Sequence, residues 1–157
     1  EPRGASILVL GAGEAAAAAV FAGILAGAAR VSVRNRNVQR AADLVERFPG
    51  ERVRLFEPTG AAAEFDLVVQ ATSLGLKSED PLPLRFSGPA PAHALDLVYR
   101  PGGTRWVAHA RSRGVNAEDG HRVLLEQGVL SLELWLGRAL PSSVRASMQR
   151  ALDSGGA

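Results

Sequence analysis

The sequence of 157 residues contains no cysteine, so disulfide frameworks, thiolate metal sites and cysteine nucleophiles are excluded for this chain. Lysine is almost as scarce: Lys77 is the only one among 18 Lys and Arg residues, and any mechanism that needs a lysine has one candidate. Aromatic residues make up 5% of the chain, and the net charge is only +2. Such a small excess of positive charge does not indicate a nucleic-acid-binding surface.

Long apolar runs are also missing, and no signal-peptide pattern opens the chain, so we expect a soluble, cytoplasmic protein with no membrane partner. Hydrophobic residues at 46% and charged residues at 22% are typical of a globular protein. The length predicts a single domain over residues 1–157. Because the chain begins with Glu1 rather than Met, we expect it to be part of a longer protein.

Short branched apolar runs alternate with helical patterns along the chain. This alternation predicts an α/β fold of the Rossmann-like, doubly wound type, with a mostly parallel sheet covered by helices on both faces. Ligands of such sheets bind beyond the carboxyl ends of the strands. We expect strands at 7–10, 30–34, 52–56, 66–71, 93–98 and 114–117, helices at 15–26, 38–48, 104–113, 122–136 and 142–152, one or two helical turns around 60–63, and a proline-rich loop over 73–91.

The first expected strand and helix are separated by the segment 11–16, which satisfies the pattern G-x-G-x-x-G/A. Gly11 allows the tight turn, Gly13 lets the backbone approach a pyrophosphate, and Ala16 permits close packing of the helix on the sheet. An ordinary glycine turn without a ligand is the alternative. Glu14 is an unusual residue here, because its carboxylate would repel a pyrophosphate if it pointed inward.

The end of the second expected strand distinguishes NAD from NADP, because an acidic residue there binds the ribose 2′-hydroxyl, whereas arginine accommodates a 2′-phosphate. The segment 34–37 reads Arg-Asn-Arg-Asn, and Arg40 lies one helical turn later. Guanidinium groups bind phosphate bidentately, so this segment favours NADP. The alternative is a solvated basic loop.

Three further motifs follow in order: Ala71-Thr72-Ser73-Leu74-Gly75-Leu76, then Asp96-Leu97-Val98-Tyr99-Arg100-Pro101 with Thr104, and finally Gly120, Leu124, Gln127, Leu134, Trp135 and Gly137. Together with the glycine-rich segment and the Asn35-Arg36 pair, they cover nearly the whole chain. The chain resembles the C-terminal, NADP-binding domain of the shikimate dehydrogenase family. Gln70 is one departure from the family pattern, which usually has Asn at this point, and Glu14 is another.

The resemblance implies NADP as cofactor and the reversible reduction of 3-dehydroshikimate to shikimate in aromatic amino-acid biosynthesis. By the same resemblance, Tyr99 and Gln127 would face the substrate; the alternatives are an aromatic at the sheet edge and a polar residue on a helix face. Asn35, Arg36 and Arg40 would hold the 2′-phosphate, Thr72 and Leu74 would line the cofactor groove, and Gly120 and Val123 would lie near the nicotinamide. The expected cofactor site also includes Gly11, Ala12, Gly13, Glu14, Ala15, Asn37, Ala71, Ser73 and Leu97.

Ketone reduction needs a proton donor, which the family provides as a Lys and Asp pair in its N-terminal domain. Lys77 lies beside Glu79 and Asp80 in the proline-rich loop and is interpreted as part of a solvated charge cluster, so we expect no catalytic residue in this chain. The missing N-terminal domain and shikimate or 3-dehydroshikimate are the expected partners, and a homodimer is compatible with the sequence. A stand-alone NADP(H)-binding regulatory module and an inactive relative are the alternatives. The three histidines have no metal-ligand spacing, so no metal site is expected.

Overall fold

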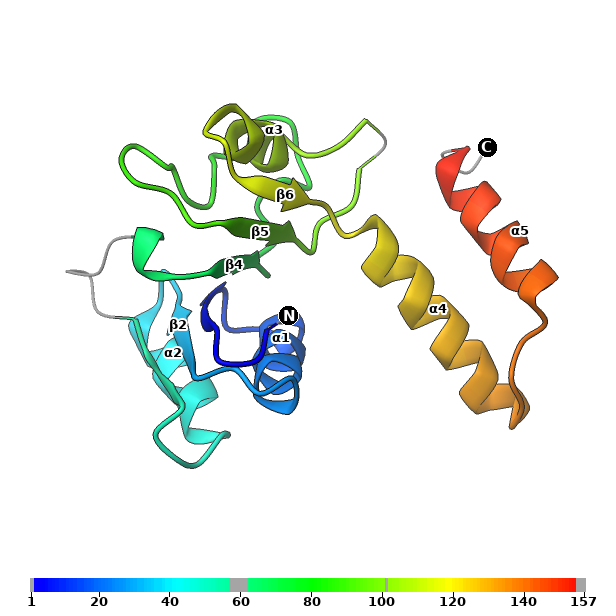
Figure 1. The fold of residues 1–157 in the computed structure, drawn as a ribbon, viewed down its shortest axis with the longest axis horizontal. Helices are drawn as coiled ribbons and strands as arrows, with labels where there is room; N and C mark the ends of the chain where they lie inside the picture. The colour runs from blue at the N-terminus through cyan, green and yellow to red at the C-terminus, as the bar shows by residue number, and fades with distance from the viewer. Residues whose placement is uncertain (1, 57–61, 101, 155–157) are drawn as a thin grey trace.

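The computed structural model describes residues 2–56, 62–100 and 102–154, and strands alternate with helices through most of this length (Figure 1). The described residues form one six-stranded parallel sheet in the order β3-β2-β1-β4-β5-β6. The order reverses direction between β1 and β4, as in doubly wound dinucleotide-binding folds. The predicted fold class is confirmed. The elements are β1 (Ser6–Leu10), α1 (Glu14–Leu25), β2 (Arg30–Arg34), α2 (Val38–Glu46), β3 (Val53–Leu55), a 3₁₀ turn (Ala62–Glu64), β4 (Leu67–Gln70), β5 (His93–Asp96), α3 (Arg105–Ser112), β6 (Asn116–Glu118), α4 (His121–Leu136) and α5 (Ser142–Asp153).

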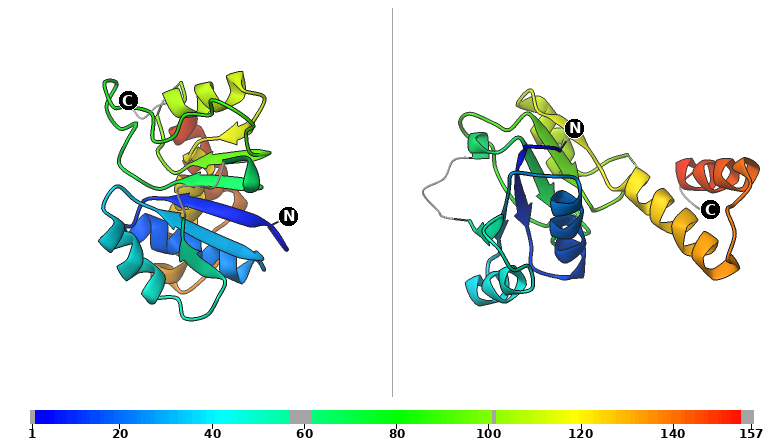
Figure 2. Two further views of the ribbon diagram at one scale, coloured as in Figure 1. Left: turned by 90° about the vertical axis from the view of Figure 1, so that its left-hand side faces the viewer. Right: turned by 60° about the horizontal axis from the view of Figure 1, so that its bottom comes forward.

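The core lies on both faces of the sheet. In β1, Ile7 and Val9 belong to a cluster beneath α1 and α2, whereas Leu8 and Leu10 belong to a second cluster beneath α3 and the loop before β5. Successive strand residues point to opposite faces, so a strand buried on both sides reads as a continuous apolar run. Figure 2 shows helices on either side of the strands.

Small residues make the contact between α1 and the sheet. Ala16 and Val20 are fully buried, and a Cβ atom on Gly23 would lie 3.1 Å from the Ile7 side chain. The spacing of Val20, Phe21, Ile24 and Leu25 in the sequence predicts one buried face for this helix. For two of them the prediction is wrong, because Phe21 is 58% exposed and Leu25 is 77% exposed. The helix lies so close to the strands that alanine and glycine fill the interface, and the bulky side chains lie outside it.

Most predicted elements are confirmed within two residues, and the differences have local causes. β5 ends at Asp96 rather than at residue 98, because the Asp96 carboxylate accepts a hydrogen bond from the Val98 amide and turns the chain. The last strand begins at Asn116 rather than at 114, because the amide of Val115 still bonds to the Ala110 carbonyl at the end of α3. The short helical segment expected around 60–63 is found at 62–64, and residues 60 and 61 lie outside the described part of the chain.

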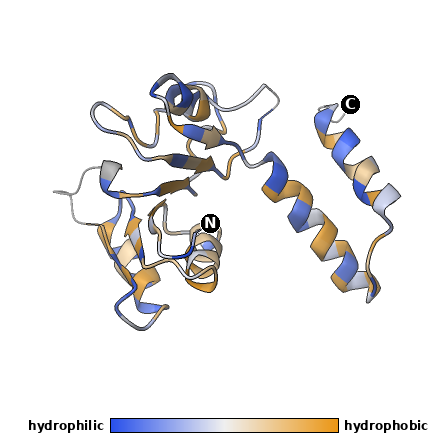
Figure 3. Ribbon diagram, in the orientation of Figure 1, coloured by the Kyte–Doolittle hydropathy of each residue, from blue (hydrophilic) through white to orange (hydrophobic). Residues whose placement is uncertain are grey.

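The last two helices project from the sheet and form a hairpin (Figures 1 and 2). An ion pair between Arg145 and Glu126 connects α5 to α4. Only Leu125 and Val129 of α4 are buried, and the exposed apolar residues of this helix include Leu130, Leu134 and Trp135; hydrophobic residues recur along it in Figure 3. None of the described helices is both long enough and apolar enough to cross a bilayer.

Candidate functional site

Five loops lie at the carboxyl-terminal end of the sheet, because all six strands are parallel and their carboxyl ends point the same way. These loops follow β1, β2, β4, β5 and β6. The structure therefore places most of the residues singled out in the sequence beyond the carboxyl ends of the strands. They fall in the segments 11–15, 35–40, 71–74 and 97–99 and at Gly120.

The glycine turn after β1 touches the loop after β4. Gly11 has a φ of +120°, and a Cβ atom at this position would lie 2.6 Å from the carbonyl oxygen of Ala71. The Gly11 amide also donates to the Arg34 carbonyl at the end of β2, at 2.8 Å. Only glycine fits this backbone conformation and this close approach, which agrees with the role predicted for it.

The amino end of α1 is left without a side-chain cap. Gly13 is its N-cap residue and supplies no capping atom, and apart from Gly13 and its two chain neighbours no heavy atom of the described residues lies within 4 Å of the position that a Cβ would occupy. By contrast, Asn37 caps α2 and Thr104 caps α3. The first N–H groups of an α-helix have no partner within the helix, so those of α1 are available to an anion beside an open surface.

The carboxylate of Glu14 is turned to solvent. Its side chain is 87% exposed, and Arg47 at the end of α2 donates to both of its oxygens, at 3.2 and 3.4 Å. Glu14 therefore pairs with a cation on the neighbouring helix rather than pointing inward over the glycine turn. Its neighbour Ala15 is exposed, while Ala12 is half-buried.

The segment after β2 presents two arginines to solvent. Arg36 and Arg40 are exposed, and no ion pair is formed by either side chain within the described residues. Asn35 donates to the Asn37 carbonyl at 2.9 Å, and the Asn37 side chain accepts from the Arg40 amide at 3.2 Å. Asn37 thus has a capping role that sequence reasoning did not assign, although Asn at a helix start is a recognisable signal.

A buried glutamine shapes the loop after β4. Gln70, which is fully buried, accepts from the Thr72 amide and donates to the Leu74 carbonyl at 2.8 Å and to the Thr72 carbonyl at 3.3 Å. The Leu74 amide in turn donates to the Thr72 hydroxyl at 3.1 Å. Ala71, Thr72 and Leu74 are partly buried, whereas Ser73 is exposed.

A buried carboxylate lies beside this glutamine in the next strand. Asp96, which pairs with Gln70 in the register of β4 and β5, accepts from the Thr104 hydroxyl at 2.7 Å and from the Val98 amide at 3.0 Å. Burial raises the pKa of Asp96, and hydrogen bonds from Thr104, Val98 and Gln70 partly offset that effect. Sequence reasoning used Asp96 only as part of a motif; a charged residue at the end of an apolar strand was the available signal.

The loop after β5 and the start of α4 are in direct contact. Gly120 is buried, and a Cβ on it would lie 2.4 Å from the Leu97 carbonyl oxygen. The Gly120 amide donates to the Val98 carbonyl at 3.2 Å. Close packing on the end of β5 therefore requires glycine at this position.

Tyr99 and Gln127, the two residues expected to face a substrate, occupy different surroundings. The Tyr99 hydroxyl donates to the Leu152 carbonyl of α5 at 2.9 Å, and the rings of Tyr99 and His121 form a T-shaped pair with centroids 5.0 Å apart. Gln127 and Val123 are exposed and line a shallow apolar groove of about 570 Å³ along α4. The structure thus places Tyr99 against the last helix, an environment that the sequence did not predict.

The proline-rich loop is pinned to α3 by three side chains. Arg105 donates to the Ser78 carbonyl at 2.7 Å, Trp106 donates to the Leu84 carbonyl at 2.8 Å, and His109 accepts from the Phe86 amide at 3.0 Å. Lys77 in this loop is exposed. Across the described residues, no cluster of three or more His, Asp or Glu side chains could hold a metal ion.

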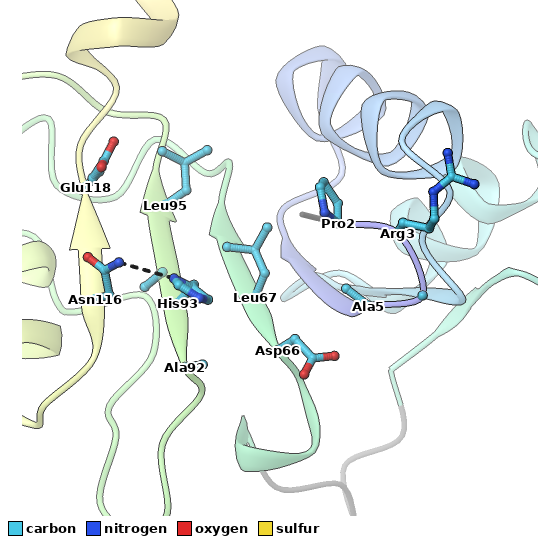
Figure 4. A pocket seen from close by; sticks show the side chains of 12 residues that line it. Pro2, Arg3, Ala5, Asp66, Leu67, Ala92, His93, Leu95, Asn116 and Glu118 are labelled. Carbon is cyan, nitrogen blue, oxygen red and sulfur yellow. Dashed lines mark hydrogen bonds between the residues drawn. The ribbon is translucent and has the colours of Figure 1, made fainter.

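A groove of about 600 Å³ lies at the opposite, amino-terminal end of the sheet (Figure 4). Asp66, His93 and Asn116 line it at the amino ends of β4, β5 and β6, together with residues 2–5. It contains none of the residues that the sequence assigns to the cofactor or the substrate.

Known proteins with similar sequences and structures agree with this arrangement. The family model "Shikimate / quinate 5-dehydrogenase" matches residues 2–77. A shikimate dehydrogenase (NADP(+)) from Rubrobacter xylanophilus is 43% identical over 144 residues, which are 87% of this chain and 51% of that protein. The crystal structure of shikimate dehydrogenase from Aquifex aeolicus matches 96% of this chain and 55% of its own at a TM-score of 0.82 and 31% identity.

The shikimate 5-dehydrogenase of Thermus thermophilus, solved in complex with NADP(H) and shikimate, matches 97% of this chain and 56% of its own at a TM-score of 0.73 and 37% identity. This chain spans about half the length of the relatives that it matches. The glycine turn, the sheet order and these similarities agree, and over most of its length this chain is similar to members of the shikimate dehydrogenase family.

Proposed function

We propose that this chain is the NADP-binding domain, over residues 1–157, of a shikimate dehydrogenase, and that it forms the C-terminal half of that enzyme. The whole enzyme would transfer hydride between NADPH and 3-dehydroshikimate to give shikimate. The names of the relatives and the half-length match support this proposal. The observation that carries it is the uncapped amino end of α1 at the glycine turn, beside the exposed arginines that follow β2.

The glycine turn would hold the pyrophosphate of the dinucleotide. Gly11 lets the chain pass under the Ala71 carbonyl, and the open surface at Gly13 leaves room for phosphate oxygens to approach the backbone. The N–H groups and the dipole of α1 favour an anion at that point. Ala12 and Ala15 have side chains small enough to leave the approach open.

Arg36 and Arg40 would bind the 2′-phosphate of the adenosine. Both are exposed after β2, where enzymes that use NAD have an acidic residue instead. Asn37 fixes the start of α2 by bonding to the Arg40 amide and so positions the segment that carries the two cations. Asn35 is already held by the Asn37 carbonyl.

The loops after β4, β5 and β6 would hold the nicotinamide end, and bound NADPH would supply the hydride. Thr72 and Leu74 come from the first loop, Leu97 from the second, and Gly120 and Val123 from the start of α4. Tyr99 and Gln127 would contact the substrate. The Tyr99 hydroxyl donates a hydrogen bond to the Leu152 carbonyl of α5. This bond would break when the hydroxyl donates to a substrate instead.

The proton donor for the ketone oxygen would come from the other half of the enzyme. Lys77 is the only lysine of the chain, and it is exposed in the loop that α3 pins. The exposed apolar residues of α4, among them Leu130, Leu134 and Trp135, would pack against that half. An exposed apolar patch next to a site is typical of an interface.

The proposal is tested by joining this chain to the N-terminal half of the Rubrobacter relative and measuring NADP-dependent oxidation of shikimate. The parental Rubrobacter enzyme is the positive control, and the same chimera with Gly13→Asp is the negative control. We expect the chimera to oxidise shikimate with NADP. A chimera that folds and binds NADP but does not oxidise shikimate would contradict the assigned reaction.

A further inference from the structure

We propose that Gln70 is a positioning residue that fixes the shape of the loop 71–74 and thereby sets the affinity of the site for the nicotinamide half of the dinucleotide. This inference rests on the proposed function. Gln70 itself is fully buried at the end of β4 and is not available to touch a ligand. It would act through the backbone that it holds.

Gln70 binds three backbone groups of one short loop. Its side-chain oxygen accepts a hydrogen bond from the Thr72 amide. Its side-chain NH₂ group donates to the backbone carbonyls of Thr72 and Leu74 at 3.3 and 2.8 Å. The side-chain amide of Gln70 thus makes hydrogen bonds of the kind that a neighbouring strand would supply, and residues 71–74 fold around it. Fixing this loop in advance reduces the conformational entropy lost when a ligand binds.

The loop that Gln70 holds forms one wall of the glycine turn. A Cβ atom on Gly11 would lie 2.6 Å from the Ala71 oxygen and 3.2 Å from the Thr72 nitrogen. The Ala71 amide donates to the Leu10 carbonyl at 2.8 Å, one residue before the turn. A shift of the loop 71–74 would therefore be felt directly beside Gly11.

The proposed 2′-phosphate site and the loop 71–74 lie on opposite sides of the glycine turn. Arg36 and Arg40 follow β2, which pairs with β1 on the edge opposite to β4. A change confined to the loop after β4 should therefore leave binding at these arginines nearly unaffected. This separation distinguishes a positioning role from a general loss of structure.

A buried carboxylate on the neighbouring strand lies next to Gln70. Asp96 lies beside Gln70 in the register of β5, and it binds Thr104, which caps α3, and the Val98 amide. A hydrogen bond from Gln70 is among the influences that lower the pKa of Asp96. The pair therefore connects the loop after β4 to the loop after β5.

Chain length at position 70 matters as much as its polarity. An asparagine, the usual residue at this point of the family pattern, is shorter by one methylene group, or about 1.5 Å. From the same Cα position it would not reach both the Thr72 amide and the Leu74 carbonyl. We therefore expect Gln70→Asn to change the loop while keeping an amide in the core.

The test compares two probes on the 157-residue chain: NADP, and adenosine 2′-monophosphate, which has the 2′-phosphate but neither the pyrophosphate nor the nicotinamide. We expect Gln70→Leu to weaken NADP by tenfold or more and Gln70→Asn to weaken it less, while adenosine 2′-monophosphate changes by less than about twofold in both. Val69→Ala, which opens a cavity in the same strand, is the matched control and should not alter the ratio of the two affinities.

Amide hydrogen exchange without ligand provides a second measurement if a variant folds poorly. The Thr72 amide should be protected in the wild type and should exchange faster in Gln70→Asn. The Leu97 amide, which bonds to the backbone carbonyl of the same Gln70 at 2.8 Å, should stay protected in both. An unprotected Thr72 amide in the wild type would overturn the inference.

The failures of the two proposals are distinguishable. Equal losses of affinity for NADP and adenosine 2′-monophosphate in Gln70→Leu, or unchanged NADP affinity in a folded variant, would refute the role of Gln70 and leave the proposed function intact. A wild-type chain that binds neither compound would refute both.

Discussion

Arg47 at the end of α2 reaches the carboxylate of Glu14 in the first turn of α1, with its Nη1 atom 3.2 Å from Oε1. The pair turns the one acidic side chain of the glycine-rich segment toward solvent. An exposed ion pair contributes little to stability. Its importance lies in the direction in which Glu14 points.

The charge of Glu14 should weaken phosphate binding even from its solvent-facing position. We expect Glu14→Gln to raise the affinity for NADP by about two- to threefold at low salt, because a unit charge in water several ångströms away is worth under 1 kcal/mol. Arg47→Ala should lower the affinity, since Glu14 would lose its cation. Titrations at several ionic strengths check both, and effects that do not shrink with added salt would speak against an electrostatic cause.

Arg36 should discriminate between the two dinucleotides. We expect Arg36→Ala to weaken NADP by about tenfold or more, because a hydrogen bond to a charged group is worth about 1.5–3 kcal/mol, and to leave NAD nearly unchanged. Arg52→Ala, on an exposed residue just before β3, is the control for overall charge. Equal losses for both cofactors would show that Arg36 does not hold the 2′-phosphate.

Gly120 should tolerate no side chain. A Cβ would lie 2.4 Å from the Leu97 carbonyl oxygen, so Gly120→Ala should lower the free energy of unfolding by about 1–3 kcal/mol through overpacking. Gly88→Ala is the matched control, because no heavy atom of the described residues beyond Gly88 and its chain neighbours lies within 4 Å of its Cβ position. Urea unfolding of both variants provides the comparison, and equal stability would mean that α4 can move away from β5.

The order of strands and helices could be predicted because each signal was local. The run Ile7 to Leu10 stops at Gly11, and the observed β1 differs by one residue. The burial of Phe21 and Leu25 was predicted wrongly, because an apolar pattern does not show how closely a helix approaches its sheet. Gly23 makes that close approach, and its effect depends on strands that are distant in sequence.

The candidate site could be predicted only in part for the same reason. The glycine turn and the arginines after β2 lie within short sequence motifs, and parallel strands bring them to one edge. The contacts of Gln70 with Leu74, of Asp96 with Thr104 and of Tyr99 with Leu152 depend on tertiary packing. Nothing in the local pattern specifies those partners.

The buried carboxyl of Asp96 should give the stability of the chain a distinctive pH dependence. Its pKa is raised in the folded state, chiefly by burial, so the folded chain binds more protons than the unfolded chain between the unfolded and folded pKa values. The contribution of Asp96 is therefore fully present below the unfolded pKa, near 3.8, and is lost as the pH rises through the folded pKa.

Asp96→Asn should remove that component of the pH dependence. Asp66, Asp80 and Glu126 have lowered pKa values through hydrogen bonds from Ser6, Lys77 and Arg145 respectively, so their contributions change in the opposite direction. Above pH 4 the stability of the variant should therefore rise more steeply with pH than that of the wild type. Urea unfolding at pH 4, 5, 6 and 7 checks the slopes, and parallel profiles would contradict the assignment to Asp96.

The most direct measurement is calorimetric titration of the 157-residue chain with NADP and with NAD under the same conditions. The glycine turn and the exposed arginines predict that NADP binds and that it binds more tightly than NAD. Absence of binding by either compound at millimolar concentration would contradict the cofactor site at Gly11 to Ala16, and a clear preference for NAD would contradict the role of Arg36 and Arg40.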